Sequence, residues 1–479
     1  LSPVHVAASL GGGVAFWVCL CFFNGIAAYG NALVAQHYGR KELHRCPQVL
    51  TQGVILAVAA QPFLLLLAWP IWHTFEWMGH APAQVALEKP YFLTMVGGGL
   101  LFLIKTVFAS YFSGTGRTRV VMIADVTGVL LNIPLTYALI FGHFGLPALG
   151  IAGAALATVA AAALTIGVYL LFYLNAIHAR RFAVRESLLY VPGIMRRYVR
   201  LGLPSGLEIF IGLGTFNVFL LLFQSYGVAE GAAMAIVFNW DMLSFVPLMG
   251  LNIAVMSMTG RFVGAGDMAR SNEVIAAGFL LGVTYSGTLA AVFVIYREAL
   301  LSVFATPGQD FTPILAIGAP MMLGMATYVI ADSLILVCSG VLRGAGDTRW
   351  LMLTSVAIHV VMLLVQLLVI LVFELGPLRS WWVFVVTLLS QAVIYLGRVV
   401  GGRWRLMDPF IDALFLQAGY NAALVTVGAA LLGFAAGASG TFLFLRQRAL
   451  VSDAVAHATL PGVGLAFILM VSLGGDGRS

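Results

Sequence analysis

Residues 113–119 read Ser-Gly-Thr-Gly-Arg-Thr-Arg, and residues 343–349 read Arg-Gly-Ala-Gly-Asp-Thr-Arg. Two glycines, a threonine and an arginine recur at an offset of 230. A second pair of motifs, Gln36-His-Tyr-Gly39 and Arg261-Phe-Val-Gly264, recurs at an offset of 225. Two independent matches with nearly the same offset predict an internal duplication.

Each copy of the first motif lies between long apolar runs, and such runs fill most of the chain. Of its 479 residues, 61% are apolar and 9% are charged. Because soluble domains are about 25% charged, this composition excludes a water-soluble enzyme. Runs of about 20 apolar residues cross a membrane as helices. The runs cover residues 10–35, 49–72, 91–113, 119–142, 148–174, 204–226, 232–257, 272–296, 312–340, 350–373, 380–400, 417–445 and 454–473. The sequence therefore predicts an all-α, polytopic membrane protein.

The basic residues predict the orientation of these spans. If the connector at 176–200 faces the cytoplasm, the loops of residues 1–406 place eighteen Lys and Arg on that side. Only Lys89, Arg297 and Arg379 fall on the opposite side. This is the positive-inside pattern of membrane proteins, and it explains the net charge of +6 without a nucleic-acid partner.

The repeat also predicts the domain organisation. Both copies of each motif lie on the cytoplasmic side, so the two lobes are parallel and each needs an even number of spans. The second lobe opens at Leu201-Gly-Leu-Pro204 and has six spans, whereas the first shows five, so we expect that an N-terminal helix has been lost. The expected boundaries are 1–175 and 201–406 for the lobes, 176–200 for the connector, and 407–479 for a further segment with about two helices.

The repeated glycines are expected to form tight turns between antiparallel helices. Gly114-x-Gly116 and Gly344-x-Gly346 resemble phosphate-binding loops only superficially. Neither follows a strand, and no Gly-Lys-Ser or Gly-Lys-Thr follows, so no ATPase site is predicted.

Ionisable residues inside spans are costly and indicate function unless they are paired. Five of them stand out: Lys105, Asp125, Glu208, Asp241 and Asp332. Asp332 precedes Arg343 by eleven residues, about 16 Å along a helix, which places it near the bilayer midplane. Asp241 is expected about 14 Å from the outer end of its helix. With Glu208, they offer oxygen ligands for Na+ or sites for a proton. Each of three acids also has a purely structural explanation. The Asp332 carboxylate could accept hydrogen bonds from Ser or Thr on neighbouring helices, and Asp241 could pack against Asn239. Asp125 could pair with Arg119 or Lys105.

Residues 1–406 resemble the multidrug and toxic compound extrusion (MATE) transporters. The resemblance rests on these blocks: Leu33-Val-Ala-Gln-His-Tyr-Gly-Arg40, Leu131-Asn-Ile-Pro134, Leu149-Gly-Ile-Ala-Gly-Ala-Ala-Leu-Ala-Thr158, Leu201-Gly-Leu-Pro-Ser205, Asn239-Trp-Asp-Met242 and Gly340-Val-Leu-Arg-Gly-Ala-Gly-Asp-Thr348. It implies twelve spans in two six-helix lobes, with an alternating cavity between them that exports organic cations against Na+ or H+ entry.

The resemblance also bears on individual residues. It implies that Asp332 is the acid used for cation coupling. The acid that the family often carries on its seventh helix aligns with Gly212 in this chain. Glu208 lies one turn earlier, so it either substitutes for that acid or lines the entrance to the cavity. In the first lobe an Asn-x-x-x-Asp pattern is replaced by Asn132 and Thr136, so a first-lobe proton site is not expected. Asn132 remains a candidate polar contact to the substrate.

The tail resembles a different family. Arg446-Gln-Arg-Ala-Leu450, Asp453-Ala-Val-Ala-His-Ala458 and Leu460-Pro-Gly-Val463 are similar to the N-terminal segment of permeases of metal-importing (Mn, Zn or Fe) ABC transporters. One further span after Arg405 would place Arg446 and Arg448 outside, against the charge rule. We therefore expect residues 408–479 to be a grafted fragment.

The expected function is cation-coupled antiport of organic cations by a monomer in contact with membrane lipid. We expect a multi-pass protein of a bacterial-type cytoplasmic (inner) membrane, with no enzymatic activity, no metal site and no cofactor beyond Na+ or H+. Three alternatives stay open: a permease subunit of a metal-ion ABC importer, a non-functional composite gene product, and a lipid-precursor flippase of related architecture.

Overall fold

The computed structural model describes residues 3–77, 81–305, 310–402 and 404. It divides into two compact units, Leu1–Val400 and Gly401–Ser479. The elements below belong to the first unit. The predicted spans at 417–445 and 454–473 lie outside the described residues.

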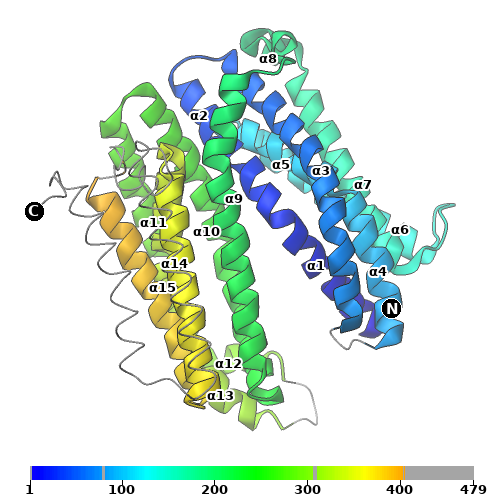
Figure 1. The fold of residues 1–479 in the computed structure, drawn as a ribbon, viewed down its shortest axis with the longest axis vertical. Coiled ribbons are helices and arrows are strands. Elements are labelled where there is room, and N and C mark those ends of the chain that lie inside the picture. Colours follow the sequence, from blue (N-terminus) through cyan, green and yellow to red (C-terminus); the bar gives the residue numbers. More distant parts are fainter. Residues whose placement is uncertain (1–2, 78–80, 306–309, 403, 405–479) are drawn as a thin grey trace, which may run out of the picture. The chain divides into compact units, whose positions relative to one another are not determined.

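The described residues of the first unit are helical apart from short connections, and Figure 1 shows their arrangement. The first half contains α1 (Pro3–Ala28), α2 (Gly30–Gly39), α3 (Arg45–Trp77), α4 (Pro82–Gly97), α5 (Gly99–Gly114), α6 (Thr118–Phe141), α7 (Gly150–Tyr173), α8 (Ala176–Phe182) and η1 (Val184–Ser187). The second half contains α9 (Pro192–Gln224), α10 (Val228–Ala265), α11 (Met268–Ile295), α12 (Arg297–Ser302), α13 (Thr312–Ala345), α14 (Thr348–Leu367), η2 (Leu368–Val372) and α15 (Pro377–Val400).

The membrane prediction is confirmed. Among the described residues, ten helical segments are long and apolar enough to span a membrane. The number rises to eleven if α4 and α5, which meet at an angle of 47°, are counted together as one bent span. This equals the number of apolar runs predicted before residue 406. Several helices exceed their predicted runs; α10, for example, begins at Val228 rather than 232. The physical reason is that apolar runs mark only the hydrocarbon-spanning part, whereas the backbone stays helical in the interface.

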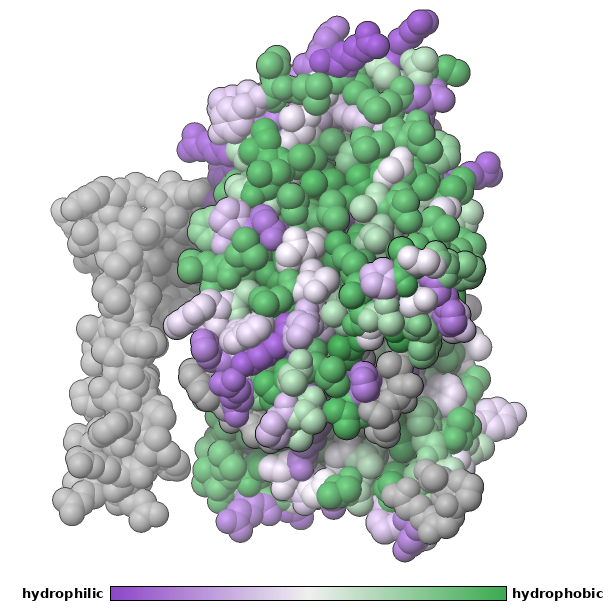
Figure 2. Space-filling model, turned by 90° about the vertical axis from the view of Figure 1, so that its right-hand side faces the viewer, coloured by the Kyte–Doolittle hydropathy of each residue, from purple (hydrophilic) through white to green (hydrophobic). Residues whose placement is uncertain are grey.

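The surface has the distribution expected of a membrane protein. Figure 2 shows one face on which hydrophobic residues cover most of the middle, while strongly hydrophilic residues gather toward the ends. In Figure 1, α8, which carries Arg180 and Arg181, lies at the same end as α2. The charge rule predicts that this end faces the cytoplasm.

The internal repeat is visible in the packing. In the second half α10 packs against α13, and in the first half α1 packs against α4 and α2 against α5. Gly116 and Gly346 occupy equivalent places after α5 and α13, with φ of 75° and 99°. Glycine adopts this left-handed conformation without steric cost, and both motifs form tight turns between helices, as predicted.

The second pair of repeated motifs forms one of the contacts between the two halves; the other large one joins α1 to α9. A side-chain carbon at Gly39 of α2 would overlap the carbonyl oxygen of Arg261 in α10. Reciprocally, a carbon at Gly264 would overlap the carbonyl oxygen of Gln36. The halves therefore cross at two equivalent glycines, and they are closely packed at the end predicted to face the cytoplasm.

Candidate functional site

Two intramembrane carboxyl groups come together in the second half. Asp241 lies on α10 and Asp332 on α13, and these two helices pack closely. The two carboxyl groups are near enough to interact electrostatically. Asp241 is 7% exposed, and Asp332 is partly exposed. Asp241 is thirteen residues into α10 and Asp332 is thirteen residues before the end of α13, so each lies about 20 Å from the nearer helix end.

Tyr328 completes this acidic cluster, which consists of Asp241, Tyr328 and Asp332. Tyr328 lies one turn before Asp332 on α13, is 1% exposed, and its hydroxyl interacts electrostatically with both carboxyl groups. Among the described residues, Asp241 Oδ1 and the Tyr328 hydroxyl have no hydrogen-bond partner of good geometry. Sequence reasoning missed Tyr328, although its i, i+4 spacing from Asp332 is a usable signal.

The acidic cluster is chemically suited to a small cation. Two like charges side by side in a medium of low dielectric constant repel unless a proton or a metal ion lies between them. Two carboxyl groups and a phenol supply only oxygen atoms, which are the ligands that hard cations prefer. Within the part of the chain that the structure describes, three or more His, Cys, Asp or Glu side chains do not gather at one point.

Glu208, the third predicted acid, has a different partner. Its carboxylate accepts a hydrogen bond of 2.9 Å from Arg343, and both side chains are largely buried. This ion pair joins α9 to the C-terminal end of α13. The structure thus brings Glu208 to Arg343 rather than into the acidic cluster. At Gly212, one turn later, an added side-chain carbon would face His359 Nε2 at 3.8 Å.

The polar residues of the first half lie apart from the acidic cluster. Asn132 is on α6, which packs against α7, and its side-chain nitrogen is buried without a partner among the described residues. Asp125 pairs with Lys105 at 3.1 Å, which is one of the two partners expected for it.

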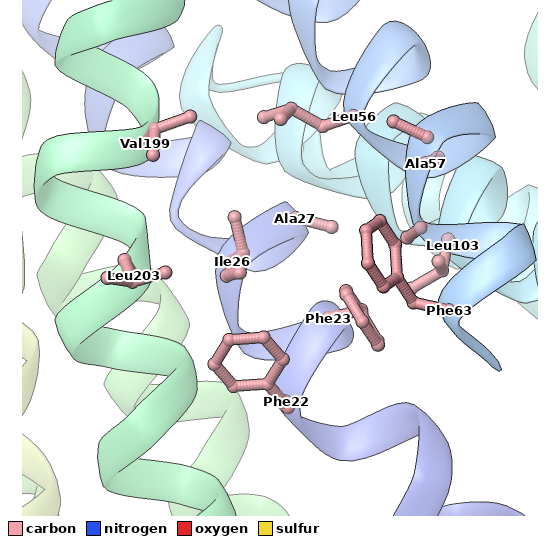
Figure 3. A pocket seen from close by; sticks show the side chains of 12 residues that line it. Phe22, Phe23, Ile26, Ala27, Leu56, Ala57, Phe63, Leu103, Val199 and Leu203 are labelled. Carbon is pink, nitrogen blue, oxygen red and sulfur yellow. The ribbon is translucent and has the colours of Figure 1, made fainter. Parts of the chain in front are cut away.

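Two apolar cavities lie between the halves. Figure 3 shows the first, of about 220 Å³, with Phe22, Phe23 and Ile26 of α1 facing Phe63 of α3 and Leu203 of α9. The second, of about 350 Å³, lies between α1 and α9 farther toward the opposite end. Asp241 and Asp332 line neither cavity. Sequence reasoning missed the three phenylalanines, because aromatic residues are common in spans and carry no sign of their orientation.

Comparison with known proteins agrees with this architecture. The profile of the MatE family matches residues 1–138 and 204–368, together more than half of the chain. The profile of the ABC 3 transport family matches residues 420–474. The tail resemblance is therefore confirmed at the level of that family.

Solved structures of low sequence identity share the fold. A MOP superfamily transporter from Pyrococcus furiosus, described as having a binding pocket of reverse polarity, has a TM-score of 0.75 at 17% identity, over 85% of this chain and 90% of that one. MATE in complex with MaD3S has a TM-score of 0.74 at 18% identity, over 85% and 90%. The eukaryotic MATE transporter AtDTX14 has a TM-score of 0.72 at 18% identity, over 85% and 89%.

The profile match covers both halves of the first unit, and the solved relatives share its helical arrangement. Such proteins are transporters rather than enzymes. The chain is thus a multi-pass membrane protein that belongs to the MATE family of transporters.

Proposed function

We propose that this protein is a cation-coupled antiporter that exports organic cations by alternating access, with Asp332 and Asp241 as the coupling groups. The observation that carries this proposal is the pairing of two intramembrane carboxyl groups beside Tyr328. Ionisable groups in spans are expensive and face protein interiors or water-filled paths when they serve transport.

The proposed coupling is electrostatic. When Na+ or H+ enters from outside, it neutralises the acidic cluster and removes its attraction for a cationic cargo. The apolar part of the cargo occupies the cavities between the halves, where Phe22 and Phe63 offer aromatic surfaces to a flat cation. Glu208 and Asn132 are proposed as further polar contacts, Glu208 near the cytoplasmic mouth through its pair with Arg343.

The lobes are proposed to comprise residues 1–175 and 201–406, joined by the connector at 176–200. This division is supported by equivalent helix pairs in the two halves: α10 packs against α13 in the second half as α1 packs against α4 in the first. We propose that the protein acts as a monomer in a bacterial-type inner membrane. Residues 407–479 are proposed to derive from the N-terminal segment of a metal-type ABC permease, for which the family match at 420–474 is the support.

Ethidium efflux tests the role of Asp332. Cells that express the parent protein, Asp332→Asn or Asp267→Asn are loaded with ethidium, and the loss of fluorescence is followed. Asp267 is a matched control because it caps α11 at the surface, away from the acidic cluster. We expect Asp332→Asn to slow efflux by about tenfold or more, whereas Asp267→Asn retains the parent rate. Equal rates for Asp332→Asn and the parent, at equal membrane abundance, would reject the assignment.

The coupling ion is tested in proteoliposomes that contain the purified full chain. A Na+ gradient and a pH gradient are imposed separately, and ethidium movement is measured for each. Antiport predicts that one gradient drives ethidium against its concentration difference. A metal importer instead predicts ATP hydrolysis stimulated by Mn2+ or Zn2+ when the chain is co-expressed with an ATPase subunit. That outcome would favour the alternative indicated by the tail.

A further inference from the structure

A cavity of about 460 Å³ opens at the cytoplasmic end of the first unit, apart from the acidic cluster. The ends of three helices form it: the end of α2, the start of α3 and the start of α9. The polar side chains that line it are His37, His44, Arg45, Gln48 and Arg197. The proposed transport function uses none of them.

The electrostatics of this cavity favour an anion. Arg45 and Arg197 contribute two guanidinium groups, and Arg40 lies close enough to act on Arg197. Glu42 is the acid that lies against this group. Its carboxylate contacts His37 Nδ1 at 2.7 Å and Arg45 at 3.6 Å. The hydrogen bond from His37 and the charge of Arg45 lower the pKa of Glu42. One carboxylate does not balance three guanidinium groups.

The backbone adds to this preference. Val191, Gly193 and Ile194, at the start of α9, also line the cavity, and Arg45 is the first residue of α3. The N-terminus of a helix carries a partial positive charge. At α3 the N–H groups of Arg45 and Cys46 already donate to the carbonyl oxygens of Glu42 and Leu43, so this terminus contributes its charge rather than free donors. Two such termini, together with the guanidinium groups, surround one space. Arg45 has a side chain that is 46% exposed, so an anion from the cytoplasm or from the lipid surface can reach it.

We propose that this cavity, here called the cytoplasmic anion site, binds a phosphate group through Arg45 and Arg197. The guanidinium fork matches the oxygen geometry of phosphate, and its hydrogen bonds to an anion are about twice as strong as neutral ones. Two sources offer this chemistry, the headgroup of an anionic phospholipid and free phosphate, and the experiment below distinguishes them.

The cytoplasmic anion site is linked to the contact between the halves. Arg197 of α9 donates a hydrogen bond to Gln36 Oε1 of α2 at 2.5 Å. Gln36 Nε2 in turn donates to the carbonyl oxygen of Gly344 in α13 at 2.8 Å. A phosphate held by the other N–H groups of Arg197 fixes this side chain while it holds Gln36. Occupancy is therefore expected to stabilise the closely packed cytoplasmic end.

The test is a binding measurement on the purified full chain in neutral detergent. Thermal unfolding is followed by tryptophan fluorescence while inorganic phosphate replaces chloride at constant ionic strength. A second series replaces a short-chain phosphatidylcholine with the corresponding phosphatidylglycerol. We expect a saturable rise in the unfolding midpoint in at least one series, because a ligand that binds only the folded state stabilises it.

Variants locate the effect. Arg45→Gln and Arg197→Lys are expected to weaken binding about tenfold or more. Arg270→Gln removes an exposed cytoplasmic arginine outside the cavity and should bind as the parent does. Hydrogen exchange in α2 should slow on ligand addition in the parent and in Arg270→Gln, but not in Arg45→Gln.

Each outcome is decisive. A response to inorganic phosphate that Arg45→Gln abolishes supports a site for free phosphate. A response confined to phosphatidylglycerol, with the same dependence on Arg45, supports a lipid headgroup site. If neither series stabilises the parent, or if Arg45→Gln and Arg270→Gln respond alike, the proposal is wrong. None of these measurements depends on ethidium transport, so a failure of the antiport proposal is recognised separately.

Discussion

At the scale of single residues, the side chains of Asp241 and Asp332 destabilise each other when both are charged, because two carboxylates in a low-dielectric interior repel. Asp241→Asn removes one of these charges. At pH 8 without Na+, we expect the relief of like-charge repulsion to raise the stability of the purified protein by on the order of 1 kcal/mol. The measurement is thermal unfolding beside the parent and Asp267→Asn. A loss of stability larger than that of the control would show that the two carboxyl groups do not repel.

His178 in the connector is expected to make the stability of the folded protein depend on pH. It is 1% exposed and bonded to the Tyr111 hydroxyl at 2.9 Å. Burial, followed by the charges of Arg117 and Arg181, lowers its pKa from 6.5 to about 4. Between these values the unfolded chain binds the proton and the folded chain does not. The stability that the neutral imidazole contributes is therefore present above pH 6.5 and is lost toward pH 4, by at most about 3 kcal/mol.

The corresponding test compares thermal unfolding at pH 7.5 and 4.5. His178→Gln should be less stable than the parent at pH 7.5, but its stability should fall less on acidification. His143→Gln, which changes an exposed histidine in the loop after α6, should retain the acid sensitivity of the parent. An equal loss of stability in the parent and in His178→Gln would contradict this account.

The crossing of α2 and α10 is the decisive contact at the scale of elements. Gly264→Val would force a side chain against the Gln36 carbonyl and should destabilise the protein by about 1–3 kcal/mol. Gly250→Val, on the same helix, is the matched control, because an added carbon there meets open space. Its effect should stay within about 0.5 kcal/mol. If thermal unfolding shows equal stability for the two variants, the close approach of α2 and α10 at Gly264 is refuted.

Orientation is a property of the whole molecule. The charge rule places the connector inside and the loop between α6 and α7 outside. The four native cysteines are buried, so introduced cysteines can be labelled against a low background. On intact cells, an impermeant maleimide should label Leu146→Cys and leave Glu186→Cys unlabelled. Both should react in opened membranes. The reverse pattern on intact cells would invert the topology.

The sequence by itself was sufficient to predict the helical spans, the internal repeat and the glycine turns, and its charge distribution predicts the orientation. These properties depend on local composition, on charge counts and on matching motifs, all of which are linear in the chain. It also singled out the intramembrane acids, because the cost of a charge in lipid depends only on its position within a span.

Only the tertiary structure decided which of these side chains meet. Asp241 lies with Asp332 and Tyr328, whereas Glu208 pairs with Arg343, although the sequence offered all three acids as candidates for one coupling site. The reason is that the rotation of each helix about its axis determines the partners of its side chains. That rotation is set by close packing between helices distant in sequence, such as α9 with α14 and α10 with α13, and not by the run of residues within one helix.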